Sequence, residues 1–99
     1  LNMITESQRR KLRALAEQAR PTIKLSDNHI GAKEIIDISI ALDRYELVKI
    51  ALPITPQTDS KTILNAVCAL TGAEPISANH GEIAVYRRSS CGGAKHIEI

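Results

Sequence analysis

The stretch G-A-K-E-I-I-D-I-S-I-A-L-D-R-Y-E-L-V-K-I-A-L, residues 31–52, decides the fold because the spacing of its apolar residues changes part-way. In its first half, apolar residues such as Ile38 and Leu42 recur at helical intervals, which predicts a helix over Gly31–Arg44. Over Glu46–Leu52 successive side chains would alternate between two faces, and apolar residues fall on both of them, which predicts a strand. A helix followed directly by a strand indicates a sheet with helices packed against it.

Signals at the element ends extend this pattern in both directions. Thr5-Glu6-Ser7-Gln8 has the form of a capping box, and Pro21 ends the helix that this box begins. Polar oxygens at 58–60 can cap a third helix, and Gly72 stands where a left-handed residue ends it. A turn over 79–82 that contains glycine joins the last two strands. The flanking elements that we expect are helices over Thr5–Arg20 and from about Ser60 to Thr71, and strands over Ile23–Leu25, Glu74–Ala78 and Ile83–Arg88.

The resulting order, αβαβαββ, predicts an α+β fold. We expect a four-stranded mixed sheet, because helices between strands imply a parallel crossover and the terminal hairpin is antiparallel. With helices packed on this sheet, the expected arrangement is a mixed α/β fold in two layers. Residues 1–88 are expected to form one domain and 89–99 a Gly-containing basic tail, in which Lys95–Ile99 is a candidate terminal strand.

Length and composition agree with one small globular domain. The chain has 99 residues, of which 43% are hydrophobic and 24% charged, and this is enough for one core. No apolar run approaches the ~20 residues that span a bilayer, and the N-terminus lacks the apolar region of a secretion signal, so we expect no membrane association and a cytoplasmic location. The two cysteines form neither a disulfide framework nor a metal pattern, and Cys68 is expected in the core.

The net charge of +2 hides two basic ends. On the first helix, Arg9, Arg13 and Arg20 line one flank of the apolar stripe that contains Leu12, and Arg10 lies just beyond this flank. Guanidinium groups on a rigid helix suit the phosphate oxygens of a polyanion. A solvated helix face is the alternative, and both interpretations stay open on this segment alone.

Residues for catalysis or metal binding do not converge in the sequence. His29, His80 and His96 are far apart and no catalytic or metal motif is present, so we expect no enzyme, no metal site and no cofactor. His29 beside Asp27 is better explained as part of a polar turn. Base stacking is not the main device of a nucleic-acid binder here, since Phe and Trp are absent and Tyr occurs twice. Any RNA contact then depends on cationic side chains, backbone N–H groups and shape.

Several spaced motifs resemble one known family. In chain order, the motifs are Ile4-Thr5, Gln8-Arg9-Arg10, Leu12–Ala16, Pro21, Ala41-Leu42, Tyr45–Ile50, Thr71–Ala73 and Val85–Arg87. Together they look like the YhbY-type CRM domain (chloroplast RNA splicing and ribosome maturation), and the resemblance covers residues 3–88. It implies a fold similar to the C-terminal domain of bacterial translation initiation factor three and RNA binding. For bacterial single-domain members it also implies association with precursors of the large ribosomal subunit.

The sequence departs from this family in the loop after the first strand. Family members usually carry Gly-x-x-Gly there, whose bare backbone can approach an RNA phosphate, whereas this chain has Ser26-Asp27-Asn28-His29. Three interpretations remain open. In the first, the Ser26 hydroxyl and the His29 ring take the place of the backbone groups as RNA ligands. In the second, the loop makes no contact with RNA, and the basic side chains elsewhere in the domain bind RNA more weakly. In the third, the domain no longer binds RNA and binds a protein.

We therefore expect a small RNA-binding protein that acts as a monomer on structured ribosomal RNA during large-subunit assembly. The expected RNA-binding surface requires that the arginines of the first helix share a face with the turn between the first strand and the second helix. The alternative is a protein-interaction adaptor whose partner covers an apolar edge at Ile36 and Ile40. The candidate RNA-binding residues are Arg9, Arg10, Arg13, Arg20, Lys24, Ser26, Asn28, His29, Lys33 and Arg87.

Overall fold

The computed structural model describes residues 4–79, 81–89 and 96–99, and its elements follow the expected order αβαβαββ. The helices are α1 (Glu6–Gln18), α2 (Ala32–Tyr45) and α3 (Ser60–Thr71), and the strands are β1 (Ile23–Lys24), β2 (Leu47–Ala51), β3 (Glu74–Asn79) and β4 (Glu82–Tyr86). The α+β class and the four-stranded mixed sheet are confirmed.

The strands lie in the order β1-β2-β4-β3, so β1 and β3 form the two edges of the sheet. β1 pairs with β2 in parallel, with Lys24 opposite Ala51. β4 runs antiparallel between β2 and β3, with Glu82 opposite Ala51. Because of this register, the loops that follow β1 and β2 and the turn between β3 and β4 lie at the same end of the sheet.

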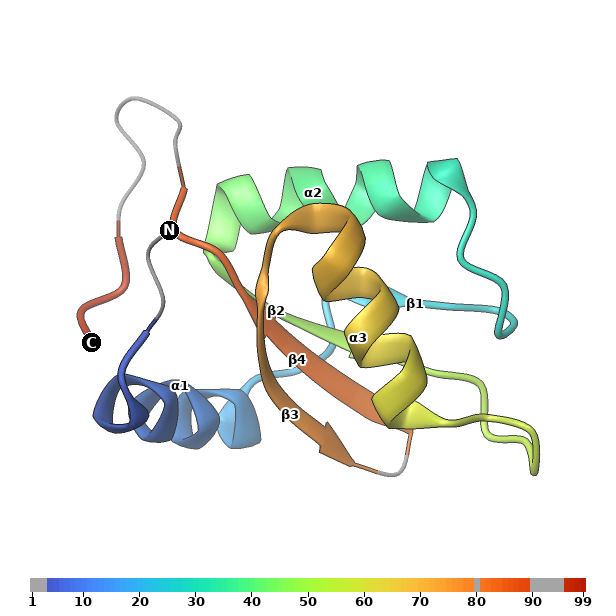
Figure 1. The fold of residues 1–99 in the computed structure, drawn as a ribbon, viewed down its shortest axis with the longest axis horizontal. Coiled ribbons are helices and arrows are strands. Elements are labelled where there is room, and N and C mark those ends of the chain that lie inside the picture. The colour runs from blue at the N-terminus through green and yellow to red at the C-terminus, as the bar shows by residue number, and fades with distance from the viewer. Residues whose placement is uncertain (1–3, 80, 90–95) are drawn as a thin grey trace.

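Helices cover both faces of the sheet. α1 packs on one face, against β2, β3 and β4, while α2 and α3 pack on the other face (Figure 1). Alternation along the strands explains this arrangement: Ile83 and Val85 of β4 belong to the core under α2 and α3, whereas Ala84 and Tyr86 belong to the core under α1. The fold therefore has three layers instead of the two that we expected, because both faces of β4 are apolar.

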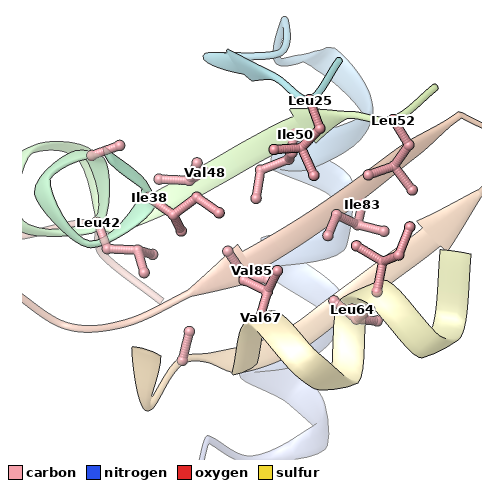
Figure 2. Packing of buried hydrophobic residues seen from close by; sticks show 13 residues of the cluster. Leu25, Ile38, Leu42, Val48, Ile50, Leu52, Leu64, Val67, Ile83 and Val85 are labelled. Carbon is pink, nitrogen blue, oxygen red and sulfur yellow. The ribbon is translucent and has the colours of Figure 1, made fainter. Parts of the chain in front are cut away.

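The main core lies between the sheet and the pair formed by α2 and α3. Figure 2 shows Val48 and Ile83 of the sheet among the side chains of Ile38 from α2 and Val67 from α3. Burial of a side chain of this size stabilises the fold by about 1.5–3 kcal/mol. A smaller core on the opposite face consists of Leu12, Ala16, Ile76, Ala84 and Tyr86.

Local capping signals set the helix ends as expected. Thr5 Oγ1 accepts a hydrogen bond from the Gln8 N–H at 3.1 Å, and Gln8 Oε1 accepts one from the Thr5 N–H at 2.9 Å, which completes the capping box. Gly72 ends α3 with a φ of +74°. In the turn between β3 and β4, Gly81 has a positive φ as expected, while His80 lies outside the described residues.

Several apolar side chains are more exposed than their helical spacing predicts. Leu70 is 61% exposed, because the buried face of α3 is centred nearer to Leu64. Leu15 of α1 is 44% exposed, since the buried stripe of this helix runs through Leu12 and Ala16. On α2, Ile36, Ile40 and the last residue, Tyr45, are the large hydrophobic side chains that are exposed.

The tail is described only at its end. Lys95 lies outside the described residues, and His96–Ile99 form no strand. Ile97 and Ile99 pack against the smaller core on the α1 side. Within residues 4–79, 81–89 and 96–99, no helix has the length and apolar character needed to cross a bilayer.

Candidate nucleic-acid interface

The basic flank of α1 faces the edge strand β3. An N–H group of Arg9 donates to the carbonyl of Pro75, and Nε of Arg13 donates to the carbonyl of Ile76 at 3.4 Å. These two guanidinium groups therefore brace α1 against β3, although Arg13 remains exposed overall. Arg10 is exposed and makes no hydrogen bond or ion pair with the described part of the chain.

A lysine of β2 holds the other end of α1. Lys49 Nζ lies 2.8 Å from the carbonyl oxygen of Ala16, 3.3 Å from that of Ala19 and 3.1 Å from Glu82 Oε1. A cation here complements the partial negative charge of the last helical carbonyls. The side chain of Lys49 is 12% exposed, so this cation has a structural role that sequence reasoning missed. The signal for this role was a lysine among apolar residues on one face of a strand.

The loop at 26–29, which leads from β1 towards α2, is exposed at all four positions. Asp27 Oδ1 accepts a hydrogen bond from the N–H of His29 at 2.7 Å, which closes a turn. The Thr58 hydroxyl lies 2.9 Å from Asn28 Oδ1 and joins this loop to the one after β2. None of the four positions has a positive φ. The loop therefore accommodates side chains where the family usually has glycine, and it presents polar side chains in place of bare backbone.

The other candidate cations are exposed. Arg20 follows α1 and Lys24 lies in the edge strand β1, and neither has an ion-pair partner within the described residues. Lys33 Nζ lies 3.7 Å from Asp37 Oδ2, one turn further along α2, and 84% of the Lys33 side chain is exposed. An exposed pair of this kind contributes about 0–1 kcal/mol. Lys33 can therefore exchange Asp37 for an RNA phosphate at little cost.

The arginines of α1 and the 26–29 loop do not form one surface, which corrects our expectation. α1 lies on one face of the sheet, whereas the loop leads into α2 on the other face, and the two are at opposite ends of the long axis in Figure 1. The reason is that Leu12 docks α1 against residues of β3 and β4, away from β1. Arg20 differs from Arg9 and Arg13 because it lies where the chain leaves α1 for β1.

Arg87, just after β4, is engaged within the fold. Its NH1 group donates to the carbonyl of Thr71 at 2.7 Å, and its NH2 group donates to the carbonyl of Ser39 at 3.0 Å and to Asp43 Oδ1 at 3.1 Å. The side chain is 24% exposed. An RNA phosphate would have to replace these partners, so Arg87 is a weaker candidate for RNA contact than Arg20 or Lys24.

Glu46, between α2 and β2, is a fully buried carboxylate that sequence reasoning did not single out. It accepts hydrogen bonds from the N–H of Ser89 at 2.6 Å and the N–H of Ile97 at 2.7 Å, and it lies 2.5 Å from His96 Nδ1. Burial acts to raise the pKa of Glu46, but the hydrogen bonds from His96, Ser89 and Ile97 outweigh burial and lower this pKa below its ordinary value of 4.5. Its φ of +65° costs a residue other than glycine about 1–3 kcal/mol.

Among the described residues, His, Cys, Asp and Glu side chains form no group of three or more that could hold a metal ion.

A model of the CRS1 / YhbY (CRM) domain matches residues 4–87 of the chain. The chain belongs to this family. One relative of this CRM domain, "Probable RNA-binding protein PA4753" of Pseudomonas aeruginosa, is 20% identical over 86 residues, which make up 87% of this chain and 83% of the relative. The solution structure of the hypothetical protein SAV1595 from Staphylococcus aureus matches with a TM-score of 0.78 and 25% identity, over 96% of this chain and 100% of that one.

These comparisons confirm the resemblance read from the sequence and support RNA binding by the CRM domain. The family is one of RNA-binding domains and is not an enzyme family. RNA binding is part of the name of PA4753 and of the description of SAV1595. The departure at Ser26 and His29 is therefore a feature of a family member, and it changes the chemistry of one loop on a shared fold.

Proposed function

We propose that this CRM domain binds structured RNA through contacts between its cationic side chains and RNA phosphates, and that it acts on precursors of the large ribosomal subunit. In this proposal the domain works in the cytoplasm, as a monomer and without catalysing a reaction. The family match over residues 4–87 carries the proposal, and the names of both relatives support its RNA-binding part.

The placement of three exposed cations supports an RNA path along the free edge of the sheet. Arg20 lies at the entry to β1, Lys24 lies in β1, and Lys33 lies in the first turn of α2. Because an extended chain advances about 3.3–3.6 Å per residue, Arg20 and Lys24 are at most roughly 14 Å apart along the backbone. One RNA strand that follows this edge can therefore contact both cations and then reach the 26–29 loop.

The 26–29 loop would contact RNA through hydrogen bonds and not through positive charge. The carboxylate of Asp27 repels a phosphate, so a head-on phosphate contact at the loop tip is unfavourable. Ser26, Asn28 and His29 are exposed beside it and offer a hydroxyl, an amide and an imidazole to RNA groups next to the path. Arg10 and Arg13, on the α1 side, would make a separate contact.

The test measures the affinity of the full chain for a labelled fragment of large-subunit ribosomal RNA at several salt concentrations. We expect Arg20→Gln and Lys24→Gln each to weaken binding. Each should also make the plot of log affinity against log salt shallower by about 0.7–0.9 for every RNA phosphate that the variant no longer neutralises. Arg44→Gln is the matched control, because Arg44 is exposed in the last turn of α2, at the end of this helix far from the 26–29 loop.

Two results would contradict the proposal. A salt slope near zero, or equal weakening in Arg20→Gln and Arg44→Gln, is incompatible with phosphate contacts along the β1 edge. The ribosomal part is tested separately by co-sedimentation of the tagged protein with ribosomal particles from cells. If the protein binds RNA in solution but does not co-sediment with large-subunit precursors, the RNA-binding part of the proposal stands and the ribosomal part is wrong.

One observation favours a second candidate function, that of a protein-interaction adaptor. Ile36 and Ile40 lie one turn apart on α2 and are 57% and 58% exposed. Exposed apolar side chains that lie side by side are typical of contacts with another protein. This function requires a partner on α2, whereas the RNA path requires the β1 edge, so substitutions at the two places distinguish them.

A further inference from the structure

The segment His96–Ile99 is held on the α1 side of the sheet by the buried carboxylate of Glu46. Glu46 Oε1 accepts from the N–H of Ile97 at 2.7 Å, and Oε2 lies 2.5 Å from His96 Nδ1. The same Oε2 also accepts from the N–H of Ser89 at 2.6 Å. One carboxylate thus receives three donors from the chain that follows β4. Hydrogen bonds to an ionised group are among the strongest in proteins.

Apolar contacts continue this attachment towards α1. Ile97 and Ile99 are half-buried against the smaller core, which includes Leu12 and Ala16 of α1. Between them, Glu98 is exposed. In Figure 1 the segment ends near the N-terminal half of α1. The end of the chain therefore extends the apolar surface on which the first helix rests.

The other anchors of α1 lie elsewhere. Lys49 holds its C-terminal end, while Arg9 and Arg13 reach β3 on one flank. Only two side chains of α1, Leu12 and Ala16, are fully buried. A short helix with so small a buried surface depends on each additional contact for its position.

We propose that His96–Ile99 is a latch that fixes α1 on the sheet, that Glu46 is the group that holds this latch, and that release of the latch weakens RNA binding. The last part rests on the proposed function, since α1 carries Arg10 and Arg13 and ends next to Arg20. The first two parts do not depend on RNA.

Two neighbouring groups do not compete with the latch for Glu46. Burial, and secondly the charge of Glu46, raise the pKa of Tyr86, and this hydroxyl makes no hydrogen bond with Glu46. Arg88, which follows β4, acts to lower the pKa of Tyr86 and makes no ion pair with Glu46. Donors from the segment that follows β4 thus satisfy the carboxylate.

The test compares amide hydrogen exchange in the unmodified chain and in three variants. Glu46→Gln keeps the size of the side chain but removes its charge and one acceptor, and Ile97→Ser keeps Glu46 but removes an apolar contact. Glu98→Gln is the matched control, because it removes a negative charge from an exposed side chain of the same segment. We expect amides of α1 to exchange about tenfold faster or more in the first two variants, with little change in β2 and β4. Glu98→Gln should match the unmodified chain.

Two exchange results overturn the latch. One is exchange in α1 that stays the same in all three variants, and the other is acceleration of equal size throughout the sheet, which would make Glu46 a support of the whole fold. The RNA part is read from the affinity for the same ribosomal RNA fragment. We expect Glu46→Gln and Ile97→Ser to bind several-fold more weakly than Glu98→Gln. Faster exchange in α1 with unchanged affinity would overturn the claim that release of the latch weakens RNA binding. No binding by the unmodified chain would remove the proposed function and leave the exchange result valid.

Discussion

Arg87 NH2 lies 3.1 Å from Asp43 Oδ1, and this ion pair connects the end of the sheet to α2. The same guanidinium group donates to the carbonyl of Thr71 at the end of α3 and to the carbonyl of Ser39 in α2. One side chain after β4 therefore links both helices that cover the main core. A guanidinium group suits this position because its donors lie in a fixed plane and reach several acceptors at once.

We expect Arg87→Gln to lower the free energy of unfolding by about 1–3 kcal/mol, because the acceptors on α2 and α3 lose their donors in a partly buried site. The slope of RNA affinity against salt should stay unchanged, since this side chain faces the helices. Urea unfolding and RNA titration measure the two quantities. Arg88→Gln serves as the control, because Arg88 is exposed. A shallower salt slope with full stability in Arg87→Gln would instead assign Arg87 to RNA.

The loop variant Ser26→Gly, Asp27→Lys, His29→Gly tests whether the 26–29 loop adjoins bound RNA. We expect higher affinity and a steeper salt slope, because lysine replaces a repelling carboxylate and glycine lets the backbone approach a phosphate. Asp27→Lys alone separates the effect of charge from that of the backbone. Unchanged affinity in both variants would mean that RNA does not reach this loop, and would favour the adaptor function.

Exposure on α2 leads to a prediction about self-association. Because Ile36 and Ile40 are more than half exposed, Ile36→Ser with Ile40→Ser should change the free energy of unfolding by no more than about 0.5 kcal/mol. We expect both the variant and the unmodified chain to sediment as monomers and to bind RNA equally. A dimer that forms with rising concentration in the unmodified chain and is absent in the variant would show that this apolar pair is an interface.

Features that depend on neighbouring residues were predicted well from the sequence. Thr5 and Gln8 cap each other within one turn, and Gly72 ends α3 in the left-handed conformation that glycine adopts without strain. The class of fold followed from the order of elements. The layering did not, because the face that receives α1 is formed by Ala84 and Tyr86, far along the chain from Leu12.

The candidate site was predicted less completely for the same reason. A helical wheel places Arg9 and Arg13 on one flank of α1, but the carbonyls that they contact lie 66 and 63 residues later. The role of Glu46 depends on His96, which is 50 residues away. Lys24, in contrast, is exposed on an edge strand as its local pattern suggests. Lys24 and Arg20, which lack such partners among the described residues, thus stayed candidates for RNA, whereas Arg9, Arg87 and Glu46 gained structural roles from theirs.

The thiol of Cys68 should react slowly. Burial, and secondly the charge of Glu74, raise the pKa of Cys68 to about 11 from an ordinary 9.0. At pH near 8 the folded chain should carry about 100-fold less thiolate than an unperturbed cysteine, and the thiolate is the reacting form. The measurement is the rate of alkylation in a Cys91→Ser background, so that one thiol remains, with the urea-unfolded chain as the reference. Equal rates in the folded and unfolded chains would contradict the burial of this thiol.

The pKa of Glu46 predicts how stability changes in acid. Its pKa is lowered in the folded chain, so Glu46 contributes stability that is fully present above its ordinary value of 4.5 and is lost as the pH falls through the lower, folded value. We therefore expect Glu46→Gln to be less stable than the unmodified chain at neutral pH and this difference to shrink below the ordinary pKa. Asp59, whose pKa is also lowered by the hydrogen bonds that it accepts from Thr62, is present in both proteins, so its effect cancels. Urea unfolding at a series of pH values gives the two curves, and a difference that grows with acidification would show that Glu46 is not held as a carboxylate in the folded chain.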